Sequence, residues 1–220
     1  MRHEAFIRHA GAFLVSLLWM WLPSSFSFAE MYVAGMAGYT APNDLTDIKG
    51  TGGASALSLS DLELQGSVAY GGKIGYFLPT VKWLGVETEL YNTTPNVKQQ
   101  PATVSGFGMS VPVGTLPGFH LRVLTWGINA VVRYPGKTFQ PYAGVGLGVF
   151  FAKATFQGQS DSDTVPGLNA LAGLRVFATD HVALFAEYKY NRATFNFPNA
   201  IGFEADYSAN IFMGGLSYHF

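Results

Sequence analysis

Apolar and polar side chains alternate along this chain with a period of two. In residues 182–191, VALFAEYKYN, every even position is apolar, whereas the odd positions include Glu187, Lys189 and Asn191. Successive side chains of a β-strand point to opposite faces, so the pattern predicts a strand with one apolar and one charged face. A helix would mix the two sets, and the chain is therefore expected to be built from strands.

The same period recurs along the chain. In WLGVETELY the even positions are apolar or Thr and the odd ones include Glu87 and Glu89, and in LTWGINAVVRY only the odd face carries Asn129 and Arg133. The segment near 31–40 has the composition of a strand, but its two faces are ambiguous. The eight predicted strands cover about 31–40, 67–78, 83–91, 124–134, 141–151, 167–178, 182–191 and 207–220.

Composition places these strands in an apolar environment. Charged residues are only 12% of the chain, aromatic residues are 15% and the mean hydropathy is +0.20. Soluble domains carry about 25% charged residues. After residue 29 no apolar run approaches the ~18 residues of a membrane helix. The net charge of −1 and the absence of cysteine predict no nucleic-acid partner and no disulfide.

The first residues resemble an export signal rather than part of the fold. Two early arginines precede an apolar run at 12–22, and Ser27 and Ala29 occupy the −3 and −1 positions of a cleavage site. The apolar run is too short for a membrane span. We therefore expect a cleaved signal peptide at 1–29 and one barrel domain at 30–220.

The connections between the predicted strands alternate in length. Such alternation, with strands of ~9–11 residues, is typical of an outer-membrane barrel, and a sheet in lipid must close to pair its edges. The fold class predicted is all-β, an eight-stranded antiparallel up-and-down transmembrane β-barrel. The short connections are 79–82, 135–139 and 179–181; the long ones are 41–65, 93–117, 157–166 and 194–206.

The chain ends on FMGGLSYHF, in which Phe212, Gly214, Leu216, Tyr218 and Phe220 share one uncharged face. That face is expected to contact lipid, with Phe220 at the membrane–water boundary beside Tyr76 and Tyr134. The segment resembles the C-terminal assembly signal of bacterial outer-membrane proteins.

QPYAGVGLGVFF, YGGKIGYFL and VALFAEYKY resemble strands of the OmpA-like membrane barrel and its relatives, over about 31–220. The resemblance implies a monomer without the peptidoglycan-binding domain, integral in the outer membrane of a Gram-negative cell envelope. The implied partners are outer-membrane lipid, lipopolysaccharide and, during insertion, the assembly machinery.

Seven charged residues fall on the face opposite the bulky apolar set. An eight-stranded barrel is just wide enough for its own side chains, so we expect the three glutamates to pair with the four cations as a plug. A narrow polar conduit is the alternative. Inward glycines either leave water-filled space or let the strands coil tightly. The lumen residues are Lys73, Glu87, Glu89, Arg133, Arg175, Glu187 and Lys189.

The sequence carries no motif for catalysis, cofactor or metal binding, so no such site is predicted. Some eight-stranded barrels are lipid A hydrolases, and His120 and Ser208 lie at similar heights, but those enzymes carry both residues on one strand. We expect His181 and His219 to be solvated. Asp161 and Asp163 are expected in a solvated loop.

The rival fold is a soluble lipocalin-like barrel, whose charges would face outward. The long connections at 41–65 and 93–117 are unusually apolar, which predicts either a β-ribbon beyond the membrane or an adhesive, ligand-capturing surface. We predict a structural or surface-interaction protein with a plugged lumen. The alternatives are a narrow channel, OmpW-like uptake of small hydrophobic solutes, and a lipid A-modifying enzyme.

Overall fold

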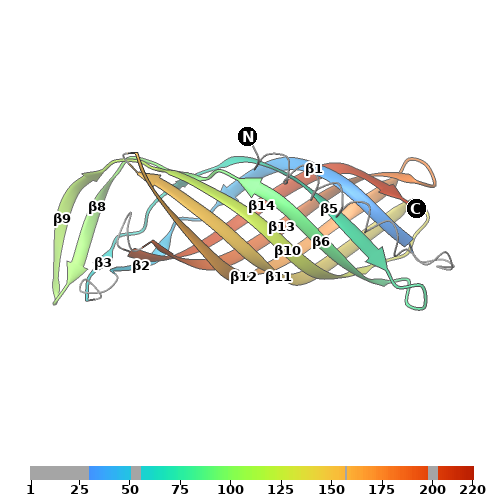
Figure 1. Ribbon diagram of the computed structural model, residues 1–220, viewed down its shortest axis with the longest axis horizontal. Helices are drawn as coiled ribbons and strands as arrows, with labels where there is room; N and C mark the ends of the chain where they lie inside the picture. Colours follow the sequence, from blue (N-terminus) through green and yellow to red (C-terminus); the bar gives the residue numbers. More distant parts are fainter. Residues whose placement is uncertain (1–29, 51–55, 157, 198–202) are drawn as a thin grey trace, which may run out of the picture.

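The computed structural model describes residues 30–50, 56–156, 158–197 and 203–220 (Figure 1). All regular secondary structure in these ranges is β. No helix in the described part of the chain is long and apolar enough to cross a membrane. The expected signal peptide, 1–29, lies outside the described residues.

Eight long strands form a closed antiparallel barrel, which confirms the predicted fold class. Each strand pairs with its neighbours in the order β1-β5-β6-β10-β11-β12-β13-β14, and β1 pairs with β14 from Tyr32–His219 to Pro42–Ala209 to close the ring. The strands are β1 (Glu30–Pro42), β5 (Ser67–Phe77), β6 (Leu84–Thr93), β10 (His120–Arg133), β11 (Phe139–Phe156), β12 (Gln159–Phe177), β13 (Val182–Phe197) and β14 (Phe203–His219).

The two sets of alternating side chains face opposite sides of the barrel wall, the charged set inward and the apolar set outward. On β13 the side chains of Glu187 and Lys189 are buried, whereas those of Leu184 and Tyr188 are exposed. This is the facing of a membrane barrel and not of a soluble one. On β1, whose facing the sequence left ambiguous, the even-numbered residues from Tyr32 to Thr40 point inward.

Short turns lie at one end of the barrel, as predicted, and we call it the tight-turn end. The C-terminus lies there too (Figure 1). At the opposite end, two predicted loops are wrong. Most of 157–166 belongs to β12, which pairs with β11 as far as Phe156–Gln159, and 194–206 is shortened by β13 and β14. Outside the membrane, a strand can be polar on both faces, because backbone hydrogen bonds to its neighbours still hold it in the sheet. The apolar pattern therefore ends before the strand does.

The two longest predicted loops fold into an extension of the sheet, at what we call the extension end. Strands β2, β3, β8 and β9 continue the sheet from the outer part of β14, and β4 pairs with β7. The β8–β9 hairpin projects beyond the barrel (Figure 1). The strands are β2 (Thr46–Gly50), β3 (Ser58–Leu59), β4 (Leu64–Gln65), β7 (Asn96–Val97), β8 (Gln100–Gly106) and β9 (Met109–Leu116).

The tip of that hairpin has the backbone of a two-residue type I′ turn. Gly106 pairs with Met109, and the two residues between them, Phe107 and Gly108, have φ of 51° and 76°. Positive φ at both central positions matches the right-handed twist of the flanking strands. The β-ribbon that the sequence offered as one interpretation of 93–117 is therefore confirmed.

Candidate functional site

The tight-turn half of the lumen is a layer of charged side chains. Five strands, β5, β6, β10, β12 and β13, each contribute at least one residue because the charges occupy their inward positions. The structure places all seven predicted residues inside, and none is more than 7% exposed. They are Lys73, Glu87, Glu89, Arg133, Arg175, Glu187 and Lys189.

Five of the seven form one chain of alternating charge. The Lys73 ammonium contacts Glu87 at 3.1 Å and Glu187 at 2.5 Å. The Lys189 ammonium contacts Glu187 at 2.8 Å and also Glu89. Glu187 is therefore the hub that joins the two lysines. Buried charges offset their desolvation only when they are paired in this way.

Neutral side chains also donate hydrogen bonds to the three glutamates. The Tyr142 hydroxyl donates to Glu187 at 2.8 Å, and the Tyr32 hydroxyl donates to Glu87. The Asn129 and Asn169 amides donate to Glu89 at 3.1 and 2.7 Å. These bonds fix the glutamates in place, so the layer is a built network and not a set of isolated pairs.

The predicted partners of the two arginines are wrong. The Arg133 guanidinium binds the Glu30 carboxylate, at 2.6 and 2.5 Å, and lies 3.6 Å from the Phe77 ring centre. Arg175 forms no ion pair with a carboxylate in the described ranges and instead lies 4.2 Å over the Tyr32 ring. Strand parity determines the side of the wall that a residue faces, but not its neighbours around the ring.

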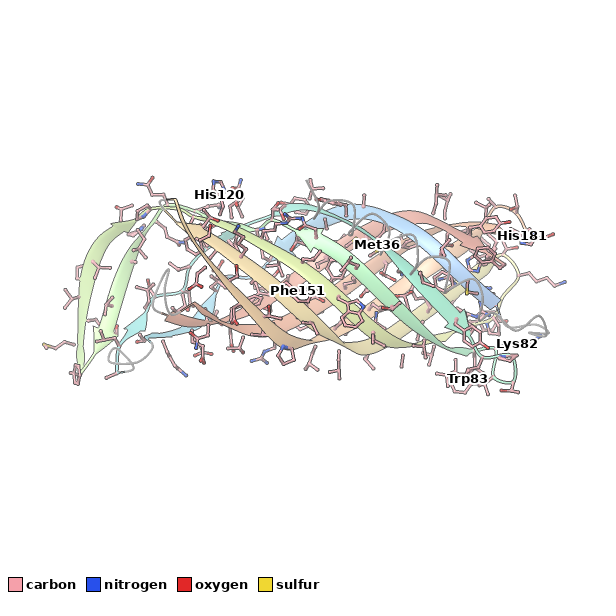
Figure 2. All side chains as sticks on the ribbon, viewed as in Figure 1. Met36, Lys82, Trp83, His120, Phe151 and His181 are labelled. Atoms are coloured by element: carbon pink, nitrogen blue, oxygen red, sulfur yellow. The ribbon has the colours of Figure 1, made fainter. Side chains whose placement is uncertain are left out.

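His219 was also predicted incorrectly, because it is buried and not solvated. Its exposed fraction is 3%, its Nδ1 lies 2.8 Å from Glu30 and its Nε2 lies 3.0 Å from the Ser217 hydroxyl. The strand continues to this residue, so alternation turns His219 inward between two outward aromatic residues. His181, by contrast, is exposed at the tight-turn end (Figure 2).

The extension half of the lumen is an apolar layer that the sequence analysis missed. It fills the barrel above the charges and is continuous with the interior of the extension, including Ile48 and Leu62. The predicted strand 124–134 stops just short of Leu121 and Val123. At this point the inward residues become apolar and the outward ones, His120 and Arg122, are polar, so the pattern of 124–134 is reversed. The layer within the barrel includes Met36, Tyr91, Leu121, Val123, Phe150, Phe195, Tyr207, Ile211 and Met213.

Two inward glycines leave room for aromatic rings and not for water. A β-carbon on Gly75 would lie 2.2 Å from the Tyr32 ring, and one on Gly173 would lie 2.5 Å from the Tyr142 ring. These rings carry the hydroxyls that bind Glu87 and Glu187. The glycines therefore make the hydrogen-bonded network sterically possible.

The outer wall carries the predicted C-terminal set. Phe212, Gly214, Leu216, Tyr218 and Phe220 all point outward. Exposed aromatic residues surround the tight-turn end, as expected of a membrane interface, and they include two that the sequence analysis did not assign there. Those at least 46% exposed are Trp83, Tyr134, Phe139, Tyr218 and Phe220.

The remaining polar residues singled out in the sequence do not assemble into a site. His120, near the extension end (Figure 2), lies on β10 with Nδ1 3.1 Å from the Asn96 amide oxygen. Ser208 lies on β14 and accepts a hydrogen bond from Asn43 at 2.8 Å; β11, β12 and β13 separate the two strands. The described residues contain no cluster suited to a metal, and Asp163 caps backbone amides.

Comparison with known proteins gives the family. The sequence model of the outer membrane protein β-barrel domain matches residues 22–220. No curated protein sequence matches significantly. The fold is similar to that of Neisserial surface protein A (16% identity, TM-score 0.53, 88% of this chain and 100% of that one). It is also similar to that of the outer membrane protein OprG from Pseudomonas aeruginosa (20% identity, TM-score 0.52, 87% and 95%). This chain belongs to the outer membrane protein β-barrel domain family, and it is an integral protein of the outer membrane.

Proposed function

We propose that this protein is a structural and surface-interaction barrel whose lumen is closed. The observation that supports this most is the stacking of two filled layers along one bore. The tight-turn half holds the chain of charges joined through Glu187. The extension half holds apolar side chains such as Phe150 and Phe195, which are fully buried. An ion would have to break the first layer and then lose its hydration in the second.

The surface role is supported by the β8–β9 hairpin. Four apolar side chains near its tip, Phe107, Met109, Val111 and Val113, are 50–83% exposed. Such a surface is a recognised mark of an interaction site. Strand β9 is the last strand of its sheet, but Pro112 and an irregular register opposite Ala102–Thr103 blunt that edge. We therefore propose contact through side chains and not through strand addition.

Planar-bilayer recording of the purified protein tests the closed lumen. The wild-type chain should give no steady conductance. A double change, Glu187→Gln with Phe150→Ala, weakens both layers and should produce openings. Leu147→Ala, which shortens an exposed side chain of the outer wall, is the matched control and should stay silent. Steady conductance of the wild-type protein would favour the narrow channel or the uptake of small hydrophobic solutes.

The surface role needs a separate assay. Cells that display the protein should bind octyl-coated beads, and Phe107→Ser with Met109→Ser should reduce that binding at equal surface amounts. Ser110→Ala, on the same hairpin, is the control. Binding that is unaffected by the double change would remove the hairpin from this role while leaving the closed lumen untouched.

A further inference from the structure

Two cations stand opposite each other on the outer wall of the barrel. Arg122 on β10 and Lys153 on β11 are direct cross-strand partners, and both side chains are exposed. Neither forms an ion pair with a carboxylate among the described residues. Like charges placed directly opposite destabilise a sheet. An anion bound between them would remove that repulsion.

Arg122 is already held in position for such an anion. Its Nε donates to the Asn92 amide oxygen at 2.6 Å, and Asn92 is only 4% exposed. The two terminal nitrogens of the guanidinium make no hydrogen bond to the described part of the chain. Terminal nitrogens arranged in this fork bind two oxygens of one phosphate group.

Another outward cation of this barrel is paired with a carboxylate of the protein itself. Arg192 on β13 forms a diagonal ion pair with Asp206 on β14, with 3.2 Å between guanidinium and carboxylate. Its charge is therefore neutralised within the protein. Arg122 and Lys153 differ because their neutralising group must come from outside.

An apolar groove begins at Arg122 and runs down the lipid-facing wall. Its volume is about 960 Å³, at the upper end of the ~300–1,000 Å³ of ligand pockets. Gly72 and Thr88 keep the groove open, and the Trp126 indole donates to the Thr88 hydroxyl at 3.1 Å, so its apolar surface is free to face a ligand. The outward side chains that line the groove are Tyr70, Ile74, Leu90, Leu124, Trp126 and Phe151.

The height of the groove matches the outer leaflet. The inner aromatic boundary lies at Tyr134, directly after β10, and the ~9–11 residues of a membrane-spanning strand counted back from it end near Leu124. Arg122 is the next outward residue, so the two cations lie at the level of the lipid headgroups. The groove lies below them, at the level of the acyl chains.

We infer that this wall binds a phosphorylated lipid of the outer leaflet. The phosphate lies between the Arg122 guanidinium and the Lys153 ammonium, and an acyl chain occupies the groove beside Trp126. This assigns a specific lipid site to the outer wall, apart from the closed lumen and the β8–β9 hairpin.

Native mass spectrometry of the protein in detergent tests the inference. The probes are dioctanoyl phosphatidic acid, dioctanoylglycerol with the same chains, and inorganic phosphate. The wild-type protein should retain the phosphatidic acid about tenfold better than the neutral lipid, since one charge-assisted contact accounts for a difference of that order. Equal retention of the two lipids would overturn the proposal, as would equally tight binding of inorganic phosphate.

Two variants and a control locate the site. Arg122→Gln should abolish the preference. Lys153→Glu places a carboxylate opposite Arg122, which favours the fold while occupying the guanidinium, so this variant should fold fully and also lose the preference. Arg192→Gln removes an outward cation elsewhere and should leave the preference intact. Unchanged retention by correctly folded Lys153→Glu protein would show that the lipid binds elsewhere.

Discussion

At the residue scale, Glu187 is the carboxylate that joins the two buried lysines of the lumen. It pairs with Lys73 on β5 and with Lys189 on its own strand, accepts a hydrogen bond from Tyr142 on β11, and is 4% exposed. A glutamate on the surface makes a different contribution to stability. Glu63 pairs with Lys98 at 2.8 Å, but both side chains are about half exposed. Burial, and not the ion pair itself, decides how much each carboxylate matters.

Changing Glu187 to Gln should therefore destabilise the barrel strongly. The change leaves two buried lysines with one carboxylate fewer, and breaking a buried pair costs about 3–5 kcal/mol. Glu63→Gln is the matched control, with a cost of about 0–1 kcal/mol. Urea unfolding of the refolded protein, followed by tryptophan fluorescence, measures both. Equal midpoints for the two variants would contradict the role of Glu187 as the hub.

Gly75 tests the steric side of the same network. In Gly75→Ala the new methyl group would overlap the Tyr32 ring, and overpacking of this kind costs about 1–3 kcal/mol. Gly35→Ala provides the comparison, because nothing lies within 4 Å of the β-carbon position there. Thermal unfolding in detergent should separate the two variants. If both melt alike, Tyr32 is free to move and the network is looser than the contacts indicate.

At the element scale, β14 is the strand on which closure depends. Its inner part pairs with β13 on one side and β1 on the other, and its outer part pairs with β2 of the extension. β14 therefore both closes the barrel, by pairing with β1, and connects it to the strands of the extension, by pairing with β2. The last residue adds little packing, since Phe220 is 63% exposed to the surroundings of the wall.

Deletion of Phe220 should impair assembly more than stability. A partly covered ring contributes less than the ~1.5–3 kcal/mol of a fully buried large apolar side chain. The assembly machinery, we propose, reads this aromatic end as a strand to be paired on an open sheet edge. Heat-modifiable gel mobility should show less inserted protein in cells but nearly normal refolding in detergent. Equal insertion in cells with and without Phe220 would show that FMGGLSYHF is only a lipid-facing strand and not an assembly signal.

At the scale of the whole molecule, the barrel and its extension form one continuous sheet with one continuous interior. The apolar layer of the lumen runs into the inside of the extension without a break. At the other end, Glu30 joins Arg133 and His219, and so connects the first barrel strand to β10 and β14. The barrel is therefore closed by packing at one end and by charge at the other.

This arrangement bears on the predicted signal peptide. Cleavage after Ala29 would leave Glu30 as the first residue and would keep its contacts with Arg133 and His219. We expect the intact mass of the protein purified from membranes to begin at Glu30. A mass that retains residues 1–29 would contradict the predicted export signal, whereas cleavage beyond Glu30 would remove the carboxylate that binds Arg133.

The barrel could be predicted from the sequence, because lipid on one side of the wall and a narrow bore on the other impose a period of two along each strand. The sequence also assigned the seven charges to the inside. At Leu121 and Val123 the apolar face turns inward, and in much of 159–166 both faces are polar. In neither place does the pattern of the membrane-spanning strands continue, and only the structure showed that the strands do. Tertiary structure alone decided which charges meet, why Arg133 binds Glu30 and why His219 is buried. Partners around a ring depend on register and shear between strands far apart in sequence, and no local period encodes them.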